Sequence, residues 1–216
     1  MSNTASPKTL AAAAKHLCDN DPVLEPIIKH FGRCTIEPHH NYYQALVDSI
    51  IGQQLSVKAA HTIRGRFYDL FDGNKLPKPK DILSMPTDKL RAAGLSYAKA
   101  GYVQDLALHI LDNKLNFDTI DKLQNQDVII TLTAVKGVGE WTAHMFMMFC
   151  MGRLDILPVG DLGIRNGIMK LYGLNDLPSP EQIREIAVKC SWHPYETVAS
   201  WYIWQSLDNK SKKLEL

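Results

Sequence analysis

Apolar residues recur at spacings of three and four along nearly the whole chain, the pattern of helices that bury one face. No run of alternating β-branched residues indicates a strand. The pattern therefore predicts an all-α protein with many helices and short connections. The predicted helices cover 8–18, 22–31, 42–54, 57–71, 80–84, 87–93, 97–112, 118–123, 126–133, 162–172, 180–190 and 195–207, with another opening at Glu140 and an extended piece at 33–38.

Two glycines lie one residue apart between the predicted helix 126–133 and the helix that opens at Glu140. Gly137 and Gly139 can adopt positive φ and allow another backbone to approach closely, so we expect a tight hairpin at 135–139. Unpaired amides at the start of the following helix form a ready anion site. The alternative is an ordinary joint between two helices, in which the glycines only turn the chain.

A lone acid, Asp161, follows the turn-forming segment 158–160 and precedes a predicted helix. Its ordinary role is that of an N-cap, and a cap also fixes the direction of a carboxylate, so capping is compatible with catalysis. The aromatic residues around it allow two interpretations as well. Trp141, Met145 and Tyr195 suit a hydrophobic core as well as they suit a binding surface.

Composition gives no signature of nucleic-acid binding. The chain has 216 residues, enough for one large domain or two small ones, and a net charge of only +1. Hydrophobic residues make up 45% and charged residues 22%, as in a soluble globular protein. Any binding of nucleic acid must therefore come from local placement of charge or from backbone amides.

The remaining sequence signals indicate an intracellular protein without a metal cluster. The cysteines show no CxxC spacing, so neither a zinc site nor an iron–sulfur cluster is supported, and reduced thiols are expected. No apolar run reaches the roughly 18 residues of a membrane span. The first twenty residues contain Lys15, His16 and Asp19 and predict a helix rather than a secretion signal. The four cysteines are Cys18, Cys34, Cys150 and Cys190.

The ordered combination of segments resembles the helix–hairpin–helix DNA glycosylase superfamily, specifically the 3-methyladenine DNA glycosylase II type. The resemblance is carried by LTAVKGVGEWTA followed by LDILPVGDLGI. In that family the active-site aspartate follows the hairpin by about twenty residues, as Asp161 follows Gly139. Residues 49–60 look like the segment that probes the DNA minor groove, and residues 192–204 are similar to the C-terminal signature. The resemblance covers about 20–207.

The resemblance implies both an architecture and an activity. It implies a single glycosylase unit of two helical lobes with the active-site cleft between them. Lobe one would comprise about 1–38 plus 160–216, and lobe two about 39–159 with the hairpin at 134–140. The activity implied is that of a monofunctional base excision repair glycosylase. It would flip alkylated purines out of double-stranded DNA and hydrolyse their N-glycosidic bonds, with 3-methyladenine as substrate and 7-methylguanine as a further candidate.

The resemblance also assigns roles to residues. Asp161 matches the catalytic aspartate, and Trp141 stands where relatives with lyase activity carry a nucleophilic lysine. Trp141, Tyr195 and Met145 would line the base pocket, and Gln54, with or without Leu55, would fill the gap left by the base. Backbone carbonyls of Thr133, Val135 and Val138 would hold Na⁺ or K⁺. The expected DNA contacts are Gln53, Gln54, Leu55, Ser56, Lys58, Lys136, Gly137, Val138, Gly139 and Thr142.

Several expectations about cofactors and partners follow from the same resemblance. Cys150 and Cys190 do not form the cysteine cluster of some relatives, so no iron–sulfur cluster and no other cofactor is expected. The expected partner is double-stranded DNA with alkylated bases, bound by a monomeric protein that does not associate with a membrane. The expected compartment is a bacterial cytoplasm or a nucleus. The alternatives are a non-catalytic binder of abasic or distorted DNA on the same scaffold, and a structural DNA-binding protein that contains a hairpin.

Overall fold

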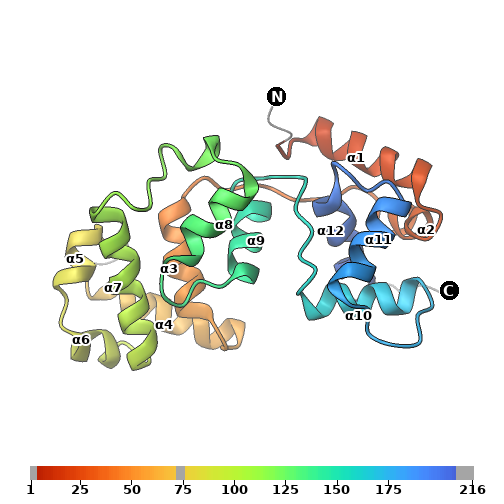
Figure 1. The fold of residues 1–216 in the computed structure, drawn as a ribbon. Helices are drawn as coiled ribbons and strands as arrows, with labels where there is room; N and C mark the ends of the chain where they lie inside the picture. Colours follow the sequence, from red (N-terminus) through yellow and green to blue (C-terminus); the bar gives the residue numbers. More distant parts are fainter. Residues whose placement is uncertain (1–3, 72–75, 208–216) are drawn as a thin grey trace. The chain divides into compact units, whose positions relative to one another are not determined.

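The computed structural model describes residues 4–71 and 76–207 and confirms the all-α prediction for that part of the chain (Figure 1). These residues form twelve α-helices and one 3₁₀ turn, and their only β pairing is an isolated bridge between Thr4 and Arg153. None of the helices described is long and apolar enough to cross a membrane. Residues 1–3, 72–75 and 208–216 lie outside the described residues.

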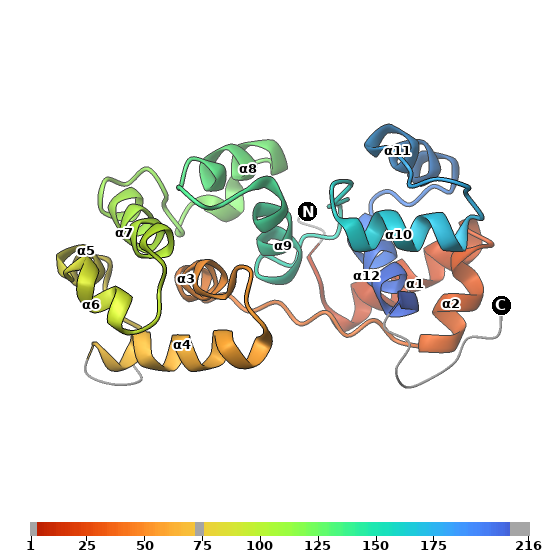
Figure 2. The same ribbon diagram turned by 90° about the horizontal axis from the view of Figure 1, so that it is seen from below.

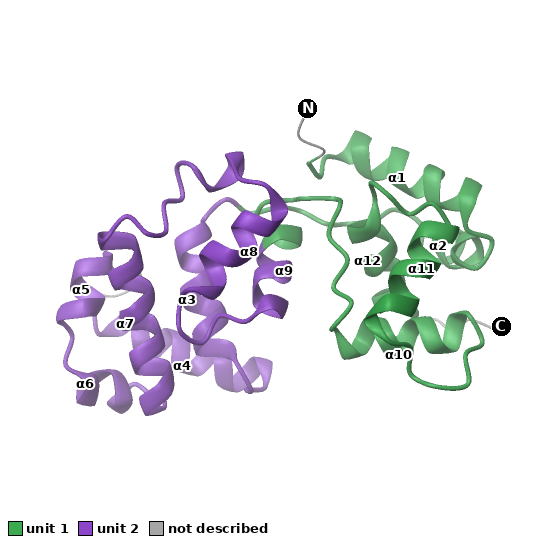
Figure 3. Cartoon of the chain, viewed as in Figure 1, with its two compact units in different colours: residues 1–39, 147–216 green, residues 40–146 purple. Residues whose placement is uncertain are grey.

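The chain divides into two compact units, which Figure 3 shows in two colours. The first unit comprises residues 1–39 and 147–216, and the second comprises residues 40–146. The division falls within helix α9 (Glu140–Phe149). The resemblance implied a division near residue 159. Residues 147–159 group with the first unit because Leu154 lies in its core and accepts a hydrogen bond from the Thr197 amide at 2.9 Å.

The first unit is built on α12, against which α1, α2 and α10 pack (Figure 2). The apolar side of each helix enters one core, which includes Leu17, Ile27, Ile168 and Ile203. The helices are α1 (Pro7–Asn20), α2 (Leu24–Phe31), α10 (Leu162–Leu171), α11 (Pro180–Lys189) and α12 (Glu196–Leu207).

A buried carboxylate, Asp21, ties the first unit together. Its Oδ1 accepts the amides of Val23 and Leu24 at 2.9 and 3.1 Å, which turns the chain from α1 into α2. Its Oδ2 accepts the Tyr172 hydroxyl at 2.5 Å and the Trp192 indole N–H at 2.7 Å. Four donors thus offset the cost of taking the charge out of water. Trp192 is itself fully buried in the core.

The second unit packs around α7, which contacts α3, α5 and α6, while α4 lies against α3. Leu46, Ile50 and Ile51 of α3 are all buried, whereas Val57 at the start of α4 is 86% exposed. The predicted helix 118–123 is a 3₁₀ turn. The elements are α3 (Tyr42–Gly52), α4 (Val57–Asp69), α5 (Pro79–Ser84), α6 (Thr87–Ala92), α7 (Tyr97–Leu111), η1 (Ile120–Lys122), α8 (Asn125–Thr133) and α9 (Glu140–Phe149).

Candidate functional site

The predicted hairpin joins α8 to α9, and only one of its two glycines is required by the backbone. Gly137 has φ +82°, and a Cβ atom there would overlap the ring of Tyr102. A Cβ atom at Gly139 would meet no atom within 4 Å. Gly137 therefore allows both the turn and the close approach of α7 to the hairpin.

Substituting Gly137 with alanine should destabilise the fold by about 1–3 kcal/mol, since a non-glycine residue in this conformation is strained and its Cβ must displace Tyr102. The same substitution at Gly139 should leave the free energy of unfolding nearly unchanged. Urea unfolding of both variants measures the difference. Equal stability of the two variants would contradict the assignment of the tight turn to Gly137.

Hydrogen bonds within the hairpin and to Asp105 of α7 fix its conformation. The Val138 amide donates to the Val135 carbonyl at 3.1 Å, and the Lys136 amide donates to Asp105 Oδ2 at 2.9 Å. The Lys136 ammonium lies 3.6 Å from Asp105 Oδ1 while staying 76% exposed. Since α9 begins at Glu140, the amides of its first turn have no acceptor within the helix, so this end favours an anion.

The loop 53–56 between α3 and α4 is fixed to this hairpin. The Gln53 side chain donates from Nε2 to the Gly137 carbonyl at 2.7 Å. Gln54 has φ +56°, a left-handed conformation that is uncommon outside glycine. Ser56 accepts the Ala59 amide at 3.3 Å and caps α4. The loop thus presents Gln54 and Leu55 outward, and Leu55 is 36% exposed.

A cavity of about 460 Å³ lies where the loop, the hairpin and the starts of α7 and α9 meet. Trp141 on its wall is 53% exposed, which is unusual for a large aromatic side chain. Met145 follows one turn later on the same helix face and is partly exposed. The cavity is lined by Gln53, Gln54, Ser96, Ala98, Lys99, Tyr102, Gly137, Trp141 and Thr142.

The cavity gathers some of the predicted residues and adds others. Five of its residues were expected from the sequence, whereas Ser96, Ala98, Lys99 and Tyr102 were not. These residues line the cavity because they contact segments some forty residues away in the chain. Such contacts produce no pattern in the local sequence. Ser56 and Lys58 line a separate hollow of about 350 Å³ on α4. The predicted residues Lys136, Val138 and Gly139 line neither of these two cavities.

Asp161 is the N-cap of α10 in the first unit, and two donors hold one of its oxygens. Its Oδ1 accepts the Ile164 amide at 2.8 Å and the Trp204 indole N–H at 3.0 Å. A Cβ atom at Gly163 would lie 2.9 Å from that oxygen and 3.0 Å from Trp204 Nε1. The carboxylate is therefore fixed by the cap and by α12. No local pattern in the sequence indicates the contact with Trp204.

Tyr195 lies in different surroundings from Asp161. Its ring packs edge-on against His16 of α1, with the ring centroids 5.2 Å apart. Nine residues separate it from Trp204, which corresponds to roughly 13 Å of rise along a helix. Trp204 near the C-terminal end of α12 thus contacts Asp161, whereas Tyr195 directly precedes the first residue of that helix.

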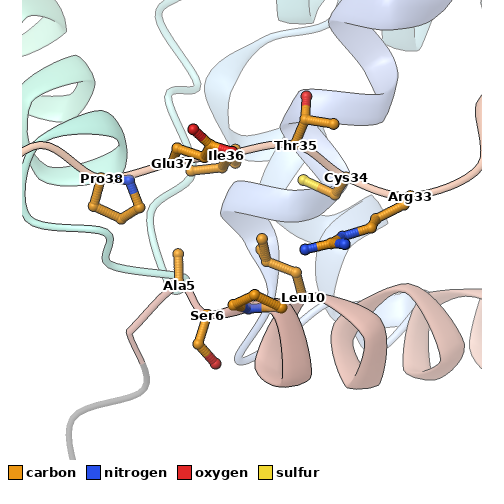
Figure 4. A pocket seen from close by; sticks show the side chains of 10 residues that line it. Ala5, Ser6, Leu10, Arg33, Cys34, Thr35, Ile36, Glu37 and Pro38 are labelled. Carbon is orange, nitrogen blue, oxygen red and sulfur yellow. The ribbon is translucent and has the colours of Figure 1, made fainter.

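The described residues contain no group of three or more His, Cys, Asp or Glu side chains that could hold a metal ion. The four cysteines are free thiols, and burial raises the pKa of Cys34 to about 11 and that of Cys150 to about 12. Figure 4 shows a cavity of about 330 Å³ between the N-terminal segment and the extended piece 33–38. None of the predicted site residues lines it.

Comparison with known proteins shows a family and several similar proteins. The family model for HhH-GPD superfamily base excision DNA repair proteins matches residues 47–191. The alkylbase DNA glycosidase-like protein mag2 of Schizosaccharomyces pombe is 32% identical, over 89% of this chain and 92% of its own. The putative DNA-3-methyladenine glycosylase YfjP of Bacillus subtilis is 28% identical, over 86% of this chain and 70% of its own.

Two solved structures have the same fold. The crystal structure of a DNA-3-methyladenine glycosidase from Bacillus halodurans aligns with a TM-score of 0.83 at 37% identity, covering 97% of this chain and 92% of that one. The Schizosaccharomyces pombe 3-methyladenine DNA glycosylase Mag1, in complex with abasic DNA, aligns with a TM-score of 0.77 at 30% identity, covering 90% and 96%. With a family model that spans more than half of its length, the chain belongs to the HhH-GPD superfamily of base excision DNA repair proteins.

Proposed function

We propose that this protein is a monofunctional DNA glycosylase that hydrolyses the N-glycosidic bond of alkylated purines, above all 3-methyladenine, in double-stranded DNA. The observation that carries the proposal is the fixed carboxylate of Asp161, held by the Ile164 amide and the Trp204 indole. Similar proteins named as 3-methyladenine glycosylases support the substrate class. The protein would act as a monomer, in the cytoplasm of a bacterium or the nucleus of a eukaryote.

Binding would begin at the hairpin and end with a base outside the stack. The α9 amides and Gly137 would hold a backbone phosphate, a contact that positions the protein without reading sequence. The target base must leave the duplex, which costs a few kcal/mol. Gln54 and Leu55, presented by the loop 53–56, would fill the vacated space and keep the base from returning.

Trp141 would receive the extruded base. A purine alkylated at N3 or N7 carries a positive charge, and a cation over an indole face gains about 0.5–2 kcal/mol. Met145, one turn further along α9, would add an apolar contact. Tyr195 of the first unit, whose ring contacts His16 at one edge and is partly exposed, is also proposed to line the pocket.

Asp161 would stabilise the transition state of bond cleavage. As the glycosidic bond lengthens, the sugar develops oxocarbenium character, and a fixed carboxylate beside it offsets the growing charge. The bonding electron pair leaves with the base and neutralises it, so an alkylated base needs no general acid. Water adds its oxygen to C1′, and one of its protons passes to solvent.

Strand cleavage is not part of the proposed reaction. Lyase chemistry needs an amine that attacks C1′, and residue 141 is a tryptophan, which has no nucleophilic amine. The product would therefore be an intact strand with an abasic site.

A monovalent cation at the hairpin is included in the proposal. Thr133 ends α8, so its carbonyl is among those left without a donor within the helix, at the end of the helix dipole that favours cations. The Val135 carbonyl already accepts the Val138 amide, and its second lone pair remains for a ligand bond. Together, the carbonyls of Thr133, Val135 and Val138 would hold Na⁺ or K⁺, which would supply positive charge to a DNA phosphate at the hairpin.

The test is base release from a panel of duplexes with 3-methyladenine, 7-methylguanine, hypoxanthine or ethenoadenine, with an undamaged duplex as control. We expect release of 3-methyladenine under single-turnover conditions, without strand cleavage until alkali is added. Tight binding to an abasic duplex with no release from any substrate would instead support a non-catalytic binder on the same scaffold.

Replacing Trp141 with leucine should slow release of the cationic base 7-methylguanine by about 2- to 30-fold, the equivalent of one cation–π contact. Release of neutral hypoxanthine should change less. Trp141→Phe, which keeps an aromatic face, should recover most of the loss. If cationic and neutral bases are affected equally in Trp141→Leu, the tryptophan contributes surface area and not charge recognition.

A further inference from the structure

Lys99 extends from the first turn of α7 to the end of α3. Its ammonium donates to the Ile51 carbonyl at 2.8 Å and to the Gln53 carbonyl at 2.5 Å. A cation suits this position because the C-terminal end of a helix carries partial negative charge. Desolvation lowers the pKa of Lys99, since both acceptors are neutral carbonyls and no carboxylate compensates.

Gln53 continues this contact to the hairpin. Its backbone carbonyl accepts from Lys99, while its side chain donates to the Gly137 carbonyl at 2.7 Å. Three segments of the second unit are thereby linked through one residue: the start of α7, the loop 53–56 and the hairpin. The next residue, Gln54, has φ +56°, a conformation that persists only where neighbouring contacts fix it.

We propose that Lys99 is a positioning residue, which together with Gln53 sets the loop carrying Gln54 and Leu55 at a fixed place relative to the hairpin. The inference rests on the proposed function, in which the hairpin holds a phosphate and the loop fills the gap left by the base. These two tasks concern neighbouring parts of one DNA strand. The distance between the hairpin and the loop must therefore match the distance between the bound phosphate and the vacated base position if the base is to stay flipped.

A simpler role for Lys99 is that of a cap on α3. A cap would contribute to stability, yet it would not distinguish DNA with a gap from DNA without one. Positioning makes a different prediction, because only a duplex with a vacated base position requires the loop to be inserted. The ratio of affinities for abasic and undamaged duplexes therefore separates the two roles.

Lys99→Met should lower the affinity for an abasic duplex, and the single-turnover rate of 3-methyladenine release, by about 10- to 100-fold, the effect of a misplaced contact group. The affinity for an undamaged duplex should fall much less. Lys89→Met, which removes an exposed lysine from α6 of the same unit, controls for the loss of one positive charge. Lys99→Arg should recover part of the loss, since a guanidinium can donate to both carbonyls.

A double-mutant cycle tests whether Lys99 and Gln53 act together. Gln53→Leu alone should reduce abasic binding in the same way, and the double variant should lose less than the product of the two single losses. Thermal melting of every variant checks that it is folded. If Lys99→Met melts as a folded protein and keeps the wild-type ratio of abasic to undamaged affinity, the positioning role is wrong.

The affinity ratio also keeps this proposal separate from the proposed reaction. A wild-type protein that releases no base would refute the glycosylase while leaving the abasic-binding test of Lys99 intact. Conversely, normal base release together with an unchanged affinity ratio in Lys99→Met would refute the positioning role alone.

Discussion

Replacing Asp161 with asparagine should slow release of 3-methyladenine by about 10²–10³-fold, the usual effect of removing one electrostatic contact to a transition state. Asparagine keeps an oxygen that can accept the Ile164 amide and the Trp204 indole N–H, and it is as good an N-cap as aspartate. The substitution therefore removes the negative charge and leaves its framework in place. Single-turnover base release from a 3-methyladenine duplex measures the loss.

Two control measurements give this result its meaning. The variant should bind an abasic duplex about as tightly as the wild-type protein does, and it should melt at about the same temperature, because the cap survives. A parallel loss of binding or stability would show that Asp161 serves the fold and not the reaction. Release at the wild-type rate would remove Asp161 from the mechanism altogether.

Periodicity predicted most helices well because they bury one face, although α12 is buried on several sides, with residues 197–200 all in the interior. The helices α3, α7 and α10 each begin at the residue predicted for them, after Asn41, Ser96 and Asp161, whose side chains all accept an amide of the first turn. The C-terminal ends are less well marked. Helix α3 stops at Gly52, two residues before its predicted end, because Gln53 leaves the helical conformation with ψ 133°, and Gln54 follows in a left-handed conformation.

The candidate site divides between features that are local in sequence and features that are not. The cap formed by Asp161 and the turn at Gly137 depend on neighbouring residues, so the sequence predicted both. The contact between Trp204 and Asp161 joins residues 43 positions apart, and Lys99 contacts a carbonyl 48 residues before it. Helical spacing reveals only that such residues face inward or outward. The DNA contacts, the base pocket and the cation ligands remain predictions.

The division into units shows the same limit. The resemblance implied a boundary near residue 159. The observed boundary at residue 146 depends on the segment 152–154, whose backbone carbonyls accept hydrogen bonds from Ala5 and Thr197. These hydrogen bonds join segments that are distant in the sequence, so the local sequence around residues 152–154 does not predict them.

Substituting Gly163 with alanine should slow base release by about 10- to 100-fold without destabilising the protein. The added Cβ would lie 2.9 Å from Asp161 Oδ1 and 3.0 Å from Trp204 Nε1, both closer than such atoms approach in ordinary contact. Either the carboxylate or the indole must move, and a displaced catalytic group loses rate steeply. Alanine favours the helix over glycine by about 0.5–1 kcal/mol, so stability should be kept or raised.

Gly160→Ala is the matched control, because a Cβ at that position would meet no atom within 4 Å. It should release base at close to the wild-type rate, although it lies next to Asp161 in sequence. Asp161→Asn tests whether the charge of the carboxylate is needed. A loss of rate in Gly163→Ala with an unchanged melting temperature would show that the position of the carboxylate matters as well. Full activity of Gly163→Ala would mean that the site tolerates a shifted carboxylate, and the contact with Trp204 would then matter for folding alone.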